Sequence, residues 1–300
     1  MIVFQRRLLF SGTPEAQSFP ERGVECWNVR EVPSLDLRGV LPLHSDWREL
    51  SCRKIRYHTS VPFEEARGPF DWGLEVEGTL EFLWRSGSRT IDYRRNSRCD
   101  SEILRYWLLH TFVPLVLELE RIYRLLHVGA VEVSGKAMLF SAFSGGGKST
   151  LTDHFLREGH PLLSDDSLGI RSDGAGGWYA VPSYPYCRPY RQAESLGKRI
   201  RNFASVPLPV GAVYLLERSD PAQAISIEAV EGIKKYEALL HSSFIDFDFM
   251  TRERFDFFSS MAREIPLYRV RYPDGREHLP ALYQRLTGHF REHFVSPTVP

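Results

Sequence analysis

Residues 142–149 read A-F-S-G-G-G-K-S, with Thr150 following, and this stretch decides the fold. It matches the phosphate-binding pattern G-x-x-x-x-G-K-[ST], except that Ala142 stands where the first glycine would be. In such a loop, backbone N–H groups surround the phosphates of a nucleotide, and the positive end of the next helix points at them. We therefore predict that the nucleotide is bound by Ser144, Gly145, Gly146, Gly147, Lys148, Ser149 and Thr150.

The segments on either side of the loop support this interpretation. Residues 137–140 are a short apolar run, which predicts a buried parallel strand. Residues 149–158 carry apolar side chains at helical spacing, and Gly159 is placed to end that helix. A strand before the loop and a helix after it are the context that the motif requires. The alternative is a glycine-rich turn that binds nothing.

The composition is that of an ordinary globular chain. Its 300 residues allow one large domain or two smaller ones, and 43% are hydrophobic and 25% charged. The 38 basic residues balance the 38 acidic ones. This balance gives no indication of nucleic acid or a membrane surface as a partner.

Cysteine spacing and hydropathy predict a cytoplasmic protein. The cysteines are far apart and form no C-x-x-C pair, which favours reduced thiols over a zinc site or a disulfide framework. Residues 1–11 contain no apolar core long enough for a signal peptide. No stretch approaches the roughly 18 apolar residues of a membrane span.

The first hundred residues differ in pattern from the rest. Residues 74–76, 80–84 and 90–93 alternate apolar and polar side chains, and Ser86-Gly87-Ser88 supplies a turn between the last two runs. This pattern is typical of a β-hairpin. We expect residues 1–98 to form a smaller, mixed and β-rich N-terminal region without catalytic motifs.

A helical connector and an α/β domain are expected to follow. Residues 101–126 show helical spacing, which Pro114 should break or kink, so residues 99–126 read as the connector. Short apolar runs then predict strands at residues 128–133, 137–140, 161–163, 213–216 and 267–270. An apolar stripe over residues 279–294 predicts a terminal packing helix. Residues 127–295 are therefore predicted to be an α/β domain built around the loop.

A pair of acids follows the strand that comes after the loop. Residues 160–166 read H-P-L-L-S-D-D, an apolar run that ends in Asp165 and Asp166. Carboxylates beside a phosphate loop suit a Mg²⁺ site, and adjacent acids raise one another's proton affinity, as a catalytic base needs. The alternative is that one acid caps a helix and the other is a solvated loop residue. Next to this loop we favour the catalytic interpretation.

These elements together resemble a known enzyme family. The segments concerned are H-V-G-A-V-E-V at 127–133, Gly135-Lys136, the loop, Gly159-His160 and Ser164-Asp165-Asp166. They are similar to the catalytic domain of the bacterial HPr serine kinases, P-loop proteins related to phosphoenolpyruvate carboxykinases. The resemblance covers residues 127–170 well and residues 213–286 as a pattern only. It implies a P-loop kinase-like fold that uses ATP and Mg²⁺.

The resemblance also implies a role for individual residues. Lys148 would hold the β- and γ-phosphates, and Ser149 and Asp166 would be ligands of Mg²⁺. Asp165 would accept the proton of a substrate serine, and His127 would orient or tune the acid and phosphate groups. A buried structural histidine is the alternative for His127.

The chain departs from the family at one motif. Nothing in it resembles the downstream E-I-R-G-L-G-like signature, and residues 181–197 read V-P-S-Y-P-Y-C-R-P-Y-R-Q-A-E-S-L-G instead. The resemblance therefore extends neither to binding of HPr nor to phosphorylase activity. The chain looks more like divergent HPr-kinase-related proteins, some of which, the lasso-peptide kinases among them, phosphorylate a precursor peptide.

The sequence thus predicts an ATP-dependent kinase acting on a serine or threonine hydroxyl of a protein or peptide. Arg188, Arg191 and Arg263 are the arginines considered for neutralising charge in the transition state. Residues 183–191 could line the acceptor cleft or be a plain surface loop. Two other functions stay open: a kinase of free serine or a sugar, and a nucleotide-hydrolysing or sensing module without an acceptor. A homo-oligomer is compatible with each.

Overall fold

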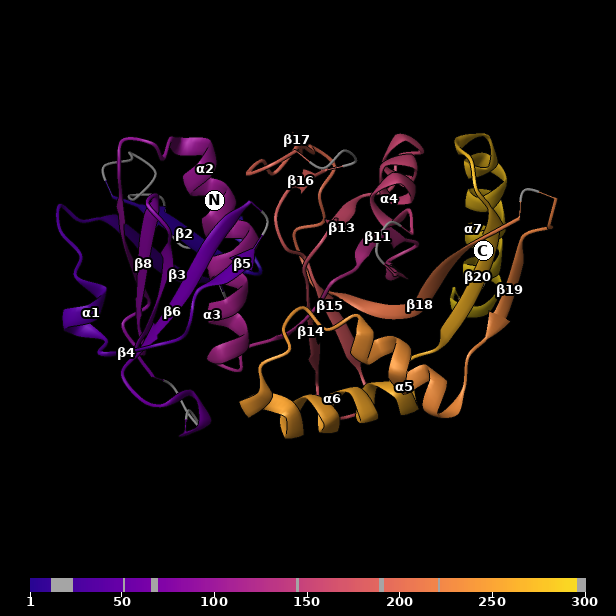
Figure 1. The fold of residues 1–300 in the computed structure, drawn as a ribbon. Coiled ribbons are helices and arrows are strands. Elements are labelled where there is room, and N and C mark those ends of the chain that lie inside the picture. Colours follow the sequence, from indigo (N-terminus) through magenta and orange to yellow (C-terminus); the bar gives the residue numbers. More distant parts are fainter. Residues whose placement is uncertain are drawn as a thin grey trace. The chain divides into compact units, whose positions relative to one another are not determined.

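The structure is a computed structural model that describes residues 1–11, 24–50, 52–65, 70–143, 146–188, 192–220 and 222–295. The chain divides into two compact units. The first is formed by Met1–Tyr123 with Arg191–Leu196, and the second by Arg124–Tyr190 with Gly197–Pro300. Each unit has its own mixed β-sheet with helices (Figure 1).

The first unit is built on a sheet with the strand order β1-β2-β3-β9-β8-β7-β6-β4, in which β5 also pairs with β6. Parallel pairing of β3 with β2 and β9 joins an N-terminal ribbon to an antiparallel meander. The elements are β1 (Ile2–Val3), β2 (Arg6–Phe10), β3 (Glu25–Glu31), α1 (Leu37–Val40), β4 (Leu43–His44), β5 (Arg48–Leu50), β6 (Arg53–Thr59), the 3₁₀ turn η2 (Phe63–Glu65), β7 (Trp72–Val76), β8 (Leu80–Arg85), β9 (Thr90–Arg95), α2 (Ser101–Tyr106), the π-helical segment η3 (Trp107–Phe112) and α3 (Val113–Leu119).

The predicted hairpin is confirmed and extends over β7, β8 and β9. Leu74 lies opposite Phe82, and Trp84 lies opposite Ile91, all with buried side chains. Phe82 also stacks on Phe112 of η3, with ring centroids 4.6 Å apart. The apolar positions of the alternating pattern therefore form the face that packs on the helical segment.

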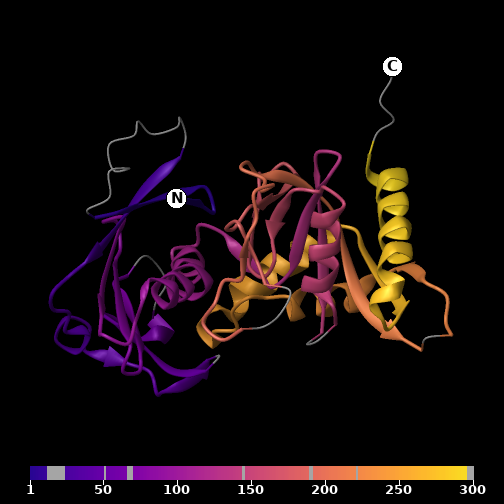
Figure 2. The same ribbon diagram turned by 90° about the horizontal axis from the view of Figure 1, so that it is seen from above.

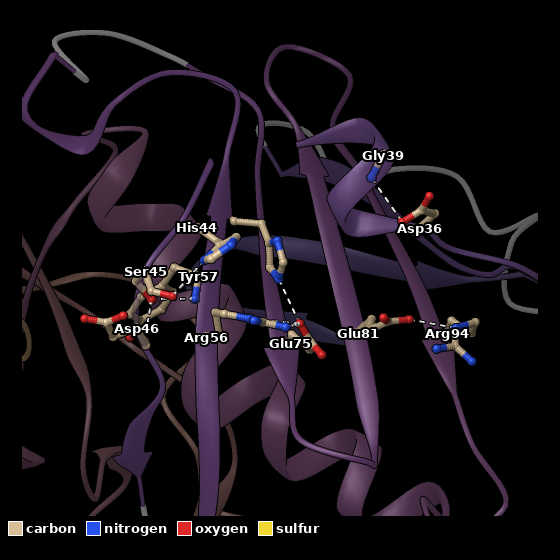
Figure 3. A network of polar contacts seen from close by, with 11 residues as sticks. Asp36, Gly39, His44, Ser45, Asp46, Arg56, Tyr57, Glu75, Glu81 and Arg94 are labelled. Atoms are coloured by element: carbon tan, nitrogen blue, oxygen red, sulfur yellow. Dashed lines mark hydrogen bonds and ion pairs between the residues drawn. The ribbon is translucent and has the colours of Figure 1, made fainter. Parts of the chain in front are cut away.

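A charged network lies across β6 and β7 of the first unit (Figure 3). The Glu75 carboxylate accepts hydrogen bonds from Arg56, at 2.6 Å, and from His58 Nε2, at 2.9 Å. Both donors are buried, and Nδ1 of His58 has no hydrogen-bond partner among the described residues. The ring of Trp47 covers the Arg56 guanidinium at 4.3 Å. The network thus holds buried charge within the sheet of the first unit.

The helix expected over residues 101–126 is only partly correct. The helical path runs through α2, η3 and α3 and ends at Leu119, and residues 124–126 form strand β10 instead. Pro114 does not break the path, because it lies in the first turn of α3, where its missing N–H costs no helical bond. Arg121, with φ of 57°, reverses the chain after α3, and Ile122 donates back to the Leu117 carbonyl.

The second unit has a sheet with the order β10-β14-β15-β18-β12-β11-β13. Strand β20 also pairs with β18, and β19 pairs with β20. The elements are β10 (Arg124–Leu126), β11 (Gly129–Val133), β12 (Lys136–Ala142), α4 (Lys148–Arg157), β13 (Leu162–Ser164), β14 (Leu168–Ser172), β15 (Trp178–Val181), β16 (Tyr186–Cys187), β17 (Lys198–Arg199), β18 (Leu208–Ser219), β19 (Ser226–Ala229), α5 (Gly232–His241), η4 (Asp248–Met250), α6 (Thr251–Glu264), β20 (Leu267–Pro273), η5 (Arg276–His278) and α7 (Leu279–Phe294).

Helices cover both faces of this sheet. Along β12, Ala137 and Leu139 pack toward α5 and α6, whereas Met138 and Phe140 pack toward α4 and α7. In Figure 1, α4 and α7 stand upright while α5 and α6 lie across the lower part of the unit. Figure 2 shows α7 (yellow) as a straight helix at the C-terminal end. Strand β12, and the loop that follows it, thus come from the middle of an α/β/α sandwich.

The predicted strands of this unit are confirmed, with differences in strand direction, length and number. The sheet is mixed: β12 pairs parallel with β18 but antiparallel with β11. Strand β18 spans 12 residues, well beyond the apolar run at 213–216. The terminal helix is confirmed as α7. Strand β14 was not predicted because its sequence, L-G-I-R-S, ends in polar residues, and the four-residue apolar run W-Y-A-V of β15 was not singled out.

Two further expectations can be compared with the structure. Cys26, Cys52, Cys99 and Cys187, all in described parts of the chain, are free thiols. Within the described ranges, no helix combines the length and the apolar character that a membrane crossing needs.

Candidate active site

The topology of the second unit brings distant parts of the sequence to one edge of its sheet. Strand β11 runs antiparallel to β12, and β13 runs antiparallel to β11, so β13 has the direction of β12. The acids after β13 therefore lie at the same edge as the loop after β12. His127, which precedes β11, lies at this edge for the same reason.

The described part of the phosphate loop ends on a helix N-terminus. Gly147 has φ of 85° and is the N-cap of α4, and it has no side chain to accept from the first N–H groups of the helix. These groups therefore point toward any anion held there. Ser149 and Thr150 follow in the first turn of α4. Ser144 and Gly145, also predicted to bind the nucleotide, lie outside the described residues.

Contacts from two sides hold the loop. The Gly146 N–H donates to the Phe143 carbonyl at 2.9 Å, and the Tyr272 hydroxyl donates to the Gly146 carbonyl at 3.1 Å. The Lys148 ammonium donates to the Ala142 carbonyl at 3.3 Å, across the base of the loop. This arrangement brings the lysine, the loop backbone and the start of α4 together.

Asp165 is a buried acid with an incomplete set of hydrogen bonds. Its side chain is 5% exposed, and Oδ2 accepts the Arg188 backbone N–H at 2.7 Å. Oδ1 is buried without a well-formed hydrogen bond to the described residues, although the nearby Ser149 hydroxyl acts to lower the pKa of this carboxyl. Burial has the larger effect, and with the charge of Asp166 it raises the pKa of Asp165. The site therefore makes Asp165 a stronger proton acceptor than an exposed aspartate, and this carboxyl lies close to Ser149 in the first turn of α4.

Asp166 lies in a different environment although it is the next residue. It is half-buried, and its Oδ1 lies 3.2 Å from Nδ1 of His127. The backbone N–H of His127 donates to the Ser242 carbonyl at 2.7 Å, which fixes the histidine from the segment after α5. Because β13 ends at Ser164, the two acids are not held in strand alternation. Asp165 turns inward and Asp166 turns to the histidine.

Two residues near the acid pair come from the segment after β15, part of the 183–191 stretch for which an acceptor cleft and a surface loop were both open. Cys187, in β16, is buried beside Asp165, and this burial and the neighbouring acids raise the pKa of its thiol. Tyr184 is buried close to Ser167 and Asp166, and burial raises its pKa as well. Their sequence signal, Y-P-Y-C-R, matches no catalytic pattern. Only the folded chain brings these groups against the acid pair.

The arginines considered for the transition state lie in different places. Arg188 touches Asp165 through its backbone and lies at the site. Arg263 is near the end of α6, just before β20 begins, so it lies at the opposite edge of the sheet from the loop. Arg191 lies outside the described residues.

The oxygen groups at this edge fit a magnesium–nucleotide complex. Mg²⁺ in such complexes takes one or two protein oxygens together with phosphates and water. The Ser149 hydroxyl and the carboxylates of Asp165 and Asp166 offer donors of this kind, and Oδ1 of Asp165 makes no well-formed hydrogen bond within the described part of the chain. Among the described residues, no group of three or more His, Cys, Asp or Glu side chains is placed to hold a metal ion.

Comparison with known proteins gives a distant structural likeness. No family model matches the sequence, and no curated protein matches it either. The solved structure of the Hpr(Ser) kinase/phosphatase from Coxiella burnetii is similar to this chain with a TM-score of 0.35 and 12% identity. The likeness covers 56% of this chain and 97% of that one. At this score the chemistry has to follow from the residues of the site itself.

Proposed function

We propose that this chain is an ATP- and Mg²⁺-dependent phosphotransferase that moves the γ-phosphoryl group to a serine or threonine hydroxyl of a protein or peptide. The observation that carries the proposal is Asp165. It is a buried acid of raised pKa next to the first turn of α4, and its Oδ1 makes no well-formed hydrogen bond to the described residues. Transfer to an acceptor hydroxyl needs a base of this kind, and a panel of acceptors separates such transfer from hydrolysis by water.

Each residue then has a task that follows from its position. Lys148 and the backbone N–H groups at the start of α4 hold the phosphates and balance their charge. Asp165 accepts the hydroxyl proton, which its raised pKa favours. His127 orients Asp166, and Ser149 with Asp166 supplies oxygen ligands for Mg²⁺. The bound metal supplies neutralisation of charge on the phosphate oxygens.

Replacement of Lys148 by alanine tests the proposal. With labelled ATP and a panel of peptides and metabolites, Lys148→Ala should reduce transfer by about 10²–10³-fold, as expected for loss of one charged transition-state contact. Lys136→Ala, at the other end of β12, is the matched control and should keep the wild-type rate. Circular dichroism should show both variants folded.

The panel also separates the other functions. Transfer to free serine or a sugar, with none to peptides, would indicate a small-molecule kinase. Rapid hydrolysis of ATP without any acceptor would indicate a hydrolase or nucleotide sensor. Normal transfer by Lys148→Ala would falsify the proposed mechanism.

A further inference from the structure

An arginine outside every recognised motif lies beside the phosphate loop. Arg218 is near the carboxyl end of β18, the strand that pairs with β12 on the side away from the acid pair. Tyr214 and Leu216 pack on the α4 face of the sheet, and strand alternation gives Arg218 the same face. Its register partner on β20 is Tyr272, which bonds to the loop.

Distances confirm that the guanidinium reaches the loop. A Cβ atom on Gly147 would lie 2.5 Å from the Tyr272 hydroxyl oxygen and 3.9 Å from a terminal nitrogen of Arg218. Burial raises the pKa of Tyr272, and the neighbouring Arg218 acts in the opposite direction. The arginine therefore lies next to Gly147, the N-cap of α4.

This position is electrostatically unfavourable unless an anion is present. A helix N-terminus carries partial positive charge, which repels a guanidinium beside it. The counter-ion in the structure is Asp274, with Oδ1 3.2 Å from the Arg218 guanidinium. The side chains of Arg218 and Asp274 are 46% and 59% exposed. An ion pair with this much solvent exposure contributes little to stability. A phosphate on the loop would be a better partner, because it can accept paired hydrogen bonds from arginine.

We propose that Arg218 binds a phosphate of the nucleotide and releases Asp274 when it does so. The inference rests on the proposed function and deepens it. Because Arg218 and the acid pair lie on opposite sides of β12, the polyphosphate lies across the end of this strand. Its transferred end points to Asp165, and its inner phosphates meet Arg218. The ligand is therefore a nucleoside polyphosphate held from both sides.

Two substitutions of opposite effect test this role. With calorimetry and a non-hydrolysable ATP analogue plus Mg²⁺, Arg218→Gln should weaken binding by about tenfold, the loss expected for one charge-assisted contact. Asp274→Asn removes the competing partner and a repelling charge, so it should tighten binding by roughly two- to fivefold. The melting temperatures without nucleotide should stay close to wild type.

Arg271→Gln is the matched control. Arg271 lies on β20, one residue from Tyr272 and on the opposite face of the sheet, and it pairs with Glu228 at 3.2 Å. That pair is exposed by 42% and 53%, much like Arg218 and Asp274. The control removes an equivalent charge and ion pair away from the loop, so its affinity for the analogue should equal that of wild type.

The outcomes distinguish this inference from the proposed function. If the wild-type chain bound no nucleotide, both would be overturned. If wild type bound the analogue and Arg218→Gln bound it equally well, only the role of Arg218 would be lost. A weakening by Asp274→Asn as large as that by Arg218→Gln would overturn the exchange, because the ion pair would then be structural.

Discussion

At the scale of single residues, Asp165 carries its negative charge at an energetic cost. Its side chain has almost no contact with water, and among the described residues one of its oxygens finds no well-formed hydrogen bond. Burial destabilises the carboxylate relative to its protonated form, and this raises the pKa of Asp165. The arrangement suits a proton acceptor and is poorly suited to a purely structural role.

We therefore expect Asp165→Asn to stabilise the nucleotide-free protein while it removes phosphoryl transfer. The folded-state pKa of Asp165 lies above the unfolded value of about 3.9, so the folded state binds more protons between the two and loses stability as pH rises. Asparagine is neutral, and its oxygen can still accept the Arg188 N–H. Between pH 4 and 8, the melting temperature of Asp165→Asn should be compared with that of wild type. It should be higher by roughly 2–4 °C at neutral pH, and the difference should shrink toward pH 4.

Asp166→Asn is the control for this prediction. It removes the partner of His127 rather than a buried charge, so no gain in melting temperature is expected. A lower melting temperature for Asp165→Asn at pH 7, or a gain independent of pH, would contradict the interpretation of Asp165.

The sequence predicts the chemistry of this site better than its geometry. The loop and the near acid pair are local patterns, and both lie at one edge of the sheet as their flanks suggest. Which acid is buried depends on the Arg188 backbone and on Cys187, more than twenty residues later, and no local pattern carries that information. Arg218 was missed for a related reason, since its place depends on strand alternation and register.

At the scale of elements, a glycine sets the distance between β11 and α4. A Cβ atom on Gly129 would lie 2.4 Å from Oγ1 of Thr152, closer than real atoms approach. The missing side chain lets the helix pack directly on the strand, and Ser149 on that helix reaches Asp165 as a result. Oγ1 of Thr152 is itself buried without a hydrogen-bond partner among the described groups.

Gly129→Ala should destabilise the second unit by about 1–3 kcal/mol, the usual effect of overpacking a core. Thr152→Ala alone should be nearly neutral, because it removes a buried hydroxyl that bonds to nothing described. The double variant should recover most of the stability lost in Gly129→Ala. Urea unfolding of the four proteins as a double-mutant cycle measures this coupling. Strictly additive effects would show that α4 and β11 do not meet as described.

Elements with a strong period were predicted well, and those decided by tertiary contacts were not. The strands of the meander, β12, α4 and α7 follow from their patterns. The chain reverses at Arg121, which has a left-handed backbone conformation that non-glycine residues seldom adopt. Because an arginine does not predict this conformation, the end of α3 could not be predicted from the sequence. Strand β18 extends past its apolar run because its pairing with β15, β12 and β20 supplies hydrogen bonds along its length.

At the scale of the whole molecule, the two units should respond differently to acid. His58 of the first unit is fully buried, and burial lowers its pKa even though Glu75 acts in the opposite direction. Burial raises the pKa of Glu75, but the hydrogen bonds from Arg56 and His58 outweigh this and lower it overall. Both shifts make the folded first unit less stable in acid.

We expect the first unit to lose stability as pH falls from 7 to 5, and His58→Gln to reduce this loss. Below about pH 6.5, His58 binds a proton more readily in the unfolded chain than in the folded chain, so acid favours unfolding. Glutamine keeps a donor toward Glu75 but does not titrate. Tryptophan fluorescence during urea unfolding mainly reports this unit, which holds every tryptophan except Trp178.

His44→Gln is the control, because His44 is an exposed neighbour whose ring lies 6.0 Å from that of His58. It should leave the pH dependence as in wild type. If the free energy of unfolding changed equally with pH in wild type and in His58→Gln, His58 would not be the group that limits stability in acid.

The first unit is discontinuous in sequence, and this has a consequence for synthesis of the chain. Glu194 lies in the short stretch of the first unit that follows most of the α/β sheet, and it binds Arg53 at 2.7 Å and the indole nitrogen of Trp107 at 2.6 Å. A ribosome that has finished Tyr123 has not yet made this carboxylate. The N-terminal unit thus reaches its final form only after Leu196 has emerged, when much of the second unit is already available to fold.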